Sequence, residues 1–127
     1  MSLKILLADD DMTAQNMGKK ILAAVGYDVI TVSNGVAAIK KIAEVHPDIV
    51  LLDAYMAGYS GVELCKKMKA TAELAKMPIL LTVGQMEPFS AEQGIKVNAD
   101  GLIVKPFDVA NLIVAVEKLV GRSRQPE

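Results

Sequence analysis

Aspartates stand directly after two apolar runs in this chain. Asp9, Asp10 and Asp11 follow the run at residues 3–8, and Asp53 follows the run at residues 49–52. If both runs are neighbouring parallel strands, three or four carboxylates meet at one edge of a sheet, where their repulsion requires a cation or a proton. The arrangement indicates a magnesium-dependent phosphoryl site.

Two further polar residues stand at the ends of later apolar runs. Thr82 lies near the end of the run at residues 79–83, and Lys105 follows the run at residues 102–104. Together with the aspartates they supply metal ligands, a carboxylate nucleophile, a hydroxyl donor and a cation. Phosphoryl transfer depends mainly on positioning and on neutralising charge on the equatorial oxygens, so these are the parts that it needs.

The elements that must position these residues alternate along the chain. Five apolar runs are separated by segments with helical periodicity, which predicts five βα units. The runs are continuous rather than alternating, so both faces of the sheet should be covered, and right-handed crossovers then give a single three-layer α/β/α sandwich. Ligands of such folds bind at the carboxyl ends of the strands. The runs are residues 3–8, 29–32, 49–52, 79–83 and 102–104.

Capping residues mark the expected helix boundaries. Ser60 with Glu63 and Ser90 with Gln93 form capping-box patterns at two helix starts. The remaining boundary residues are the N-cap candidates Asn34 and Asp108, and the helix-ending residues Gly26 and Asn98.

Composition excludes several classes of protein. The 127 residues carry a net charge of -1 and no Trp, which argues against a basic nucleic-acid surface, so we expect no direct contact with nucleic acid. One cysteine excludes an internal disulfide and a Cys-rich zinc site. No apolar run approaches the roughly 18 residues of a membrane span, so we expect no membrane contact and a cytoplasmic location.

We assign residues 1–120 to one domain and residues 121–127 to a polar tail or the start of a linker.

Four ordered motifs together resemble the receiver domain of two-component response regulators. The resemblance covers residues 4 to about 120 and implies a flavodoxin-like, doubly wound fold with a five-stranded parallel sheet in the order 2-1-3-4-5. The motifs are ILLADDD at 5–11, HPDIVLLDAYMAGYSG at 46–61, MPILLT at 77–82 and NADGLIVKPF at 98–107.

The resemblance implies a role for each residue of the acidic group. Asp53 would accept a phosphoryl group from a phosphohistidine donor and form an acyl phosphate. Asp10, Asp53 and the backbone carbonyl of Tyr55 would bind Mg²⁺ directly, and Asp9 would act through a water.

It also implies roles for the other two residues and for partners. Lys105, held by a cis bond to Pro106, would pair first with Asp53 and then with a phosphoryl oxygen, while Thr82 would move to hydrogen-bond another. The donor would be a histidine kinase or a histidine phosphotransfer protein, and phosphorylation would change affinity for an output partner. A homodimer through the fourth and fifth helical segments is left open. The domain would not be an enzyme beyond its own phosphoryl uptake and loss.

Two positions near the site depart from the family pattern, and a third, Tyr55, flanks the acceptor. Leu102 stands where an aromatic residue usually couples to the threonine, and Val83 replaces a small residue, so its bulk should narrow access to Asp53. Tyr55 lies two residues after the acceptor, and we expect it to shield the acyl phosphate from water.

Two other functions are left open. The departures at Leu102 and Val83 suit a receiver-like interaction module that works without phosphorylation. Residues 9–13 also spell D-x-D-x-T, the nucleophile motif of haloacid-dehalogenase-like phosphatases, in which Asp9 would be phosphorylated. Asp11 alone fits a helix cap, and an acidic group at a strand end can also be a solvated loop.

Overall fold

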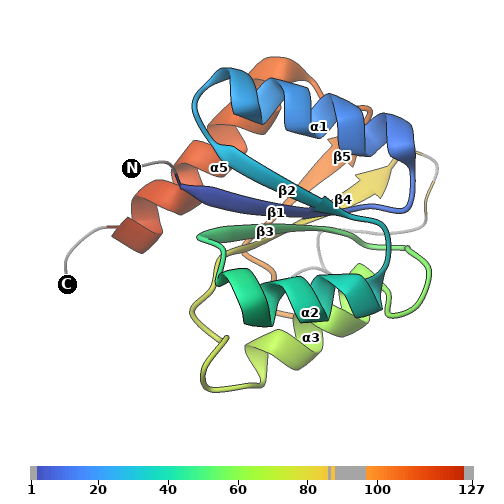
Figure 1. Cartoon of the computed structure of the whole chain (residues 1–127), viewed down its shortest axis with the longest axis vertical. Coiled ribbons are helices and arrows are strands. Elements are labelled where there is room, and N and C mark those ends of the chain that lie inside the picture. Colours follow the sequence, from blue (N-terminus) through green and yellow to red (C-terminus); the bar gives the residue numbers. More distant parts are fainter. Residues whose placement is uncertain (1–2, 86, 88–96, 125–127) are drawn as a thin grey trace.

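A five-stranded parallel sheet forms the centre of the molecule, in the order β2-β1-β3-β4-β5 (Figure 1). The computed structural model describes residues 3–85, 87 and 97–124. The order and the direction of the strands confirm the predicted flavodoxin-like, doubly wound sheet. The strands are β1 (Lys4–Ala8), β2 (Asp28–Val32), β3 (Ile49–Asp53), β4 (Ile79–Gly84) and β5 (Gly101–Lys105).

Helices cover both faces of the sheet and complete the three layers. In Figure 1, α1 (Met12–Ala24) and α5 (Val109–Arg124) lie on one face, and α2 (Gly35–Val45) and α3 (Gly61–Lys69) lie on the other. The predicted helix with the Ser90 and Gln93 cap lies outside the described residues. Helix α5 continues to Arg124, so the first residues of the segment that we assigned to a tail are helical.

The continuous apolar runs are explained by two separate cores. Successive side chains of a strand point to opposite faces, so Ile5 and Leu7 pack with α1 and α5, whereas Leu6 and Ala8 pack with α2 and α3. All four side chains are at most 1% exposed. A strand covered on both faces needs apolar residues at every position, which is the pattern that the sequence carries.

The predicted caps are present wherever the structure describes them. The side chains of Asp11 and Asn34 accept hydrogen bonds from the first turns of α1 and α2, and Asp108 accepts one from Asn111 N at 2.9 Å. At α3 the Ser60 hydroxyl accepts a hydrogen bond from Glu63 N and donates one to Glu63 Oε1, both at 3.1 Å. In a standard capping box the glutamate would instead accept from the backbone N–H of the serine.

Gly26 and Asn98, the two predicted helix-ending residues, both have left-handed backbone. Gly26, just past α1, has φ +100°, and Asn98 has φ +61°. Asn tolerates this conformation better than most residues.

A buried lysine fastens the end of the sheet that lies away from the aspartates. Lys69 Nζ donates to Asp100 Oδ2 at 2.7 Å and to the carbonyls of Ala75 and Met77 at 3.1 and 2.8 Å. Asp100 Oδ2 in turn accepts from Ile79 N at 2.8 Å. These bonds join the end of α3 to the starts of β4 and β5.

Among the described residues, no helix is both long enough and apolar enough to cross a membrane.

Candidate functional site

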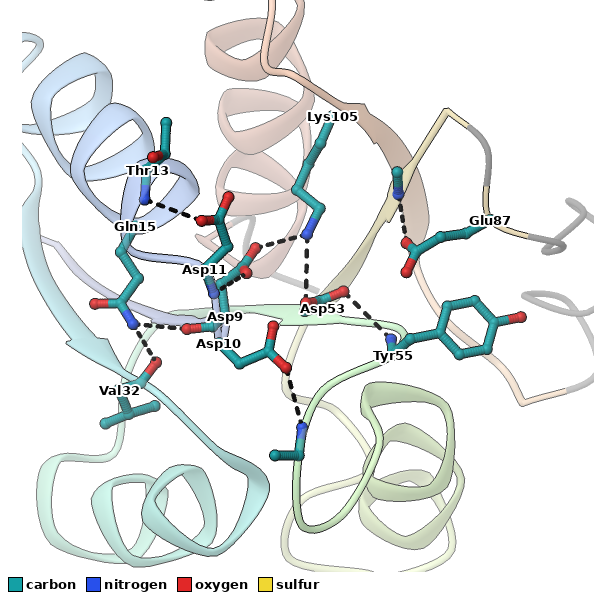
Figure 2. A network of polar contacts seen from close by, with 12 residues as sticks. Asp9, Asp10, Asp11, Thr13, Gln15, Val32, Asp53, Tyr55, Glu87 and Lys105 are labelled. Atoms are coloured by element: carbon teal, nitrogen blue, oxygen red, sulfur yellow. Dashed lines mark hydrogen bonds and ion pairs between the residues drawn. The ribbon is translucent and has the colours of Figure 1, made fainter.

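The carboxyl ends of three strands bring the predicted residues together. Strand β1 lies next to β3 in parallel register, so the aspartates after Ala8 stand beside Asp53 at the end of β3. One carboxylate oxygen from each of Asp9, Asp10 and Asp53 lies within 4.8 Å of the others. Figure 2 shows the three carboxylates pointing toward one another, with Lys105 above them.

Lys105 is the cation of this group. Its Nζ lies 2.9 Å from Asp9 Oδ2 and 3.3 Å from Asp53 Oδ2, and its side chain is only 15% exposed. The nearer partner is thus Asp9, whereas the family resemblance implied a first pairing with Asp53. The Lys105-Pro106 bond is cis, as the resemblance implied.

Asp9 and Asp10 differ in how they are held. Asp9 is fully buried, and its two oxygens accept from Asp11 N and from Lys105 Nζ, both at 2.9 Å. Asp10 is exposed, and its Oδ2 accepts from Ala57 N at 3.3 Å. Asp10 is therefore the more accessible of the two to an incoming ligand.

Burial and charge shift the proton affinity of Asp53. Burial, followed by the charge of Asp9, raises the pKa of Asp53 to about 7, although Lys105 and the hydrogen bond from Tyr55 N oppose the rise. Burial lowers the pKa of Lys105, but its hydrogen bond to Asp9 and the charges of Asp53 and Asp9 outweigh this, so the pKa is raised. A bound cation would favour the ionised form of Asp53.

The carbonyl of Asp53 requires glycine at the start of α3. A Cβ on Gly61 would lie 2.1 Å from Asp53 O, closer than any real Cβ contact. Only glycine allows helix α3 to begin this close to the end of β3.

A residue that sequence reasoning missed supports the Asp9 backbone. Gln15, 5% exposed on α1, donates from Nε2 to Asp9 O at 2.6 Å and to Ser33 Oγ at 2.9 Å. It joins the loop after β1 to the loop after β2. The available signal was weak, since a glutamine on the inner face of a helix has many other uses.

Thr82 lies beside Asp53 in the sheet. It pairs with Asp53 in the register of β3 and β4, and Ala54 N donates to Thr82 O at 2.8 Å. Its side chain is fully buried, and its Oγ1 has no hydrogen-bond partner among the described residues. A buried hydroxyl without a partner is costly, so a hydrogen bond from Oγ1 to a further acceptor would be favourable.

A cavity of about 440 Å³ opens over the aspartates and Lys105. Tyr55 lines it, as expected from its position two residues after Asp53, and Gly84 lines it as well. Val83 is 3% exposed and is not among the lining residues, so the expected narrowing by Val83 does not occur at the cavity wall. The lining residues are Asp10, Asp11, Thr13, Ala14, Met17, Asp53, Tyr55, Gly84, Glu87, Lys105, Pro106 and Phe107.

Glu87 is a second residue of the site that the sequence did not reveal. Its Oε1 accepts from Gly84 N at 2.5 Å, and the side chain lines the cavity near Tyr55 (Figure 2). A glutamate five positions after Thr82 has no motif to mark it, and only the turn after β4 brings it back to the site.

The chemistry of this group is that of an anion-binding centre with a cation site. Clustered carboxylate oxygens are the ligands that Mg²⁺ and Ca²⁺ prefer, and the cluster of Asp9, Asp10 and Asp53 could hold such an ion. Lys105 carries a fixed positive charge that could bind an anion, and Asp53 carries a carboxylate oxygen that could act as a nucleophile.

The family model for the response regulator receiver domain matches residues 5–117. The fold and the acidic site agree with that match. The chain therefore belongs to the response regulator receiver domain family of two-component systems.

Relatives of several kinds carry the same domain. Protein PilG of Pseudomonas aeruginosa is 30% identical over 115 residues, which cover 91% of this chain and 85% of PilG. The signal receiver domain of a signal transduction histidine kinase from Syntrophus aciditrophicus has a TM-score of 0.89 at 27% identity, covering 99% of this chain and 96% of that one.

The alkaline phosphatase synthesis transcriptional regulatory protein PhoP of Bacillus subtilis is 32% identical over 123 residues. The match covers 97% of this chain but 50% of PhoP, so the chain spans about half the length of that relative. PhoP is named as a transcriptional regulatory protein, so this relative gives no support to our expectation that nucleic acid is not involved.

Proposed function

We propose that this chain is a phosphoacceptor signalling domain in which Asp53 takes a phosphoryl group from a phosphohistidine of a histidine kinase or phosphotransfer protein. An Asp53 carboxylate oxygen attacks phosphorus, the P–N bond breaks, and its electron pair stays on the imidazole nitrogen. The product is an acyl phosphate on Asp53. The observation that carries the proposal is the Asp53 carboxylate held beside two other aspartates and 3.3 Å from Lys105 Nζ.

Mg²⁺ is the cofactor that we propose for this site. Asp10, Asp53 and the backbone carbonyl of Tyr55 would hold it directly, and Asp9 would hold it through a water. When bound, the ion supplies positive charge that offsets the charge of the phosphoryl oxygens. The exposed carboxylate of Asp10 and the engaged oxygens of Asp9 support this division of roles.

Lys105 and Thr82 would hold the transferred group. Lys105 is already aimed at Asp53, so it can bond to a phosphoryl oxygen without a large movement. Thr82 has a buried hydroxyl without a partner among the described residues, and a bond to a second oxygen would satisfy it. The movement of Thr82 would be the input to the switch.

Loss of the phosphoryl group would be the only other reaction of the domain. Water attacks phosphorus, the bond between phosphorus and the Asp53 oxygen breaks, and the carboxylate and inorganic phosphate are released. We therefore propose a signalling domain with limited self-catalysed turnover rather than an enzyme acting on other substrates.

The output partner, dimerisation, the cytoplasmic location and the boundary at residue 120 stay predictions. The domain would change its affinity for a protein partner or for an effector region of the same protein.

Treatment with acetyl phosphate and Mg²⁺, followed by peptide mapping, tests the proposal. We expect modification at Asp53 and none in Asp53→Asn. Modification at Asp9 instead would support the D-x-D-x-T phosphatase. The engagement of both Asp9 oxygens by Asp11 N and Lys105 argues against that outcome.

The interaction module without phosphorylation is favoured by one observation. Leu102, half-buried against the core beneath α2 and α3, has no ring or hydroxyl to report a movement of Thr82. Amide NMR shifts with and without beryllofluoride separate the two functions. Changed amide shifts in β5 support phosphorylation-dependent switching, and unchanged shifts there support the interaction module.

A further inference from the structure

The carboxylate of Glu87 closes a turn at the rim of the acceptor cavity. Glu87 Oε1 accepts from Gly84 N at 2.5 Å, and Glu87 N donates to Gly84 O at 3.1 Å. The Glu87 side chain also lies 3.3 to 3.4 Å from the place of a Cβ on Gly84. A side chain at position 84 would crowd this contact, so glycine permits it.

This turn is connected directly to the two residues that would hold a phosphoryl group. Gly84 lies two residues after Thr82 on β4, and it pairs in register with Lys105 on β5. A change in the hydrogen bond at Gly84 N therefore acts on the strand end that carries the Thr82 hydroxyl.

The charge of Glu87 is unfavourable for the group that the cavity would receive. A phosphoryl group on a side chain brings about two negative charges near neutral pH. Glu87 lines the same cavity as Asp10, Asp53 and Lys105. Its carboxylate thus adds repulsion to a space that must admit an anion.

We propose that Glu87 is an electrostatic gate for the acceptor, a role that rests on the function proposed above. While bound to Gly84 N, its carboxylate slows the entry of a phosphoryl donor. Once Asp53 carries the phosphoryl group, repulsion moves the carboxylate off Gly84 N and frees the end of β4. In a chain with Leu102 in place of a ring, this charge-dependent contact provides a link from the acceptor to the sheet edge.

The rate of phosphorylation tests the entry step. Glu87→Gln removes the charge but keeps an oxygen that can accept from Gly84 N. Glu44→Gln is the matched control, because it removes the same charge from an exposed side chain on α2 that pairs only with Lys41 among the described residues. Intact-mass spectrometry follows the modification of each protein by acetyl phosphate and Mg²⁺.

We expect Glu87→Gln to react about threefold to tenfold faster than the wild type at about 0.01 M ionic strength. The ratio of the two rates should fall toward one at about 1 M salt, where charges farther apart than about 3 Å are screened. A purely structural role would not depend on salt in this way. Glu44→Gln should match the wild type at both ionic strengths.

The Gly84 amide tests the release step. A proton donated to a carboxylate at short distance resonates downfield, so addition of beryllofluoride should move the Gly84 amide proton upfield in the wild type. In Glu87→Gln the amide should start farther upfield and move less.

The outcomes separate this proposal from the one on which it rests. No modification of Asp53 in any of the three proteins would refute the phosphoacceptor function and the gate with it. Modification of Asp53 at equal rates in wild type and Glu87→Gln, a gain that persists at high salt, or a Gly84 amide that stays in place would overturn the gate alone.

Discussion

Replacing Asp53 by asparagine should make the metal-free protein more stable near neutral pH. The buried carboxyl has a pKa of about 7 against an ordinary value of 3.8, and each pKa unit corresponds to about 1.36 kcal/mol. A shift of roughly three units sets a ceiling of about 4 kcal/mol on the cost of keeping this carboxylate ionised. Asparagine loses the attraction of Lys105, so we expect a gain of about 1 to 3 kcal/mol in the free energy of unfolding.

The gain should depend on pH in a defined direction. Because the folded pKa is raised, the native state holds the Asp53 proton more tightly than the unfolded chain, and this stabilisation is complete below about pH 4. It is lost progressively as the pH rises toward about 7 and is absent above that value. The difference between the two proteins should therefore grow between these limits and then stay level.

Urea unfolding at several pH values, with a chelator present, measures this difference. Asp28→Asn is the control, because it removes a charge from an exposed residue at the opposite end of the sheet and should change stability by less than about 0.5 kcal/mol. Equal stability of wild type and Asp53→Asn at pH 8, or a less stable variant, would refute the reasoning.

Three further changes test the site. Lys105→Met leaves two buried carboxylates without their cation, so we expect the free energy of unfolding, measured with urea at pH 7, to fall by about 3 to 5 kcal/mol. A variant as stable as the wild type would contradict a stabilising role for the two ion pairs of Lys105. Gly61→Ala places a Cβ against the carbonyl of Asp53 and should lower the free energy of unfolding in urea by more than about 2 kcal/mol. The control Gly121→Ala, on α5, places its Cβ in free space and should leave that free energy unchanged or raise it. Tyr55→Asn should shorten the lifetime of the acyl phosphate measured by its hydrolysis, and equal lifetimes would exclude shielding by Tyr55.

Much of the fold could be read from the sequence because its strands are buried on both faces. That environment leaves continuous apolar runs, and each observed strand differs from its predicted run by only a residue or so at either end. The site followed from the strands, since Asp53 and Lys105 stand at strand ends and parallel strands place those ends together.

The supporting contacts could not be read in the same way. Gln15, Lys69 and Glu87 act through side-chain bonds to distant backbone groups, and such partners depend on the exact course of loops. The preference of Lys105 for Asp9 is of the same kind, because a difference of 0.4 Å between 2.9 and 3.3 Å leaves no trace in residue spacing. Val83 shows the opposite error, since its bulk was predictable but its absence from the cavity lining was not.

The bonds of Lys69 hold one end of strands β4 and β5 in place. A charged group 8% exposed, with three oxygen partners, holds the starts of β4 and β5 to α3, and breaking it would leave a buried charge unpaired. The far ends of the same two strands carry Thr82 and Lys105. Any displacement of β4 and β5 should therefore be largest beside Asp53 and smallest at the strand ends that Lys69 holds.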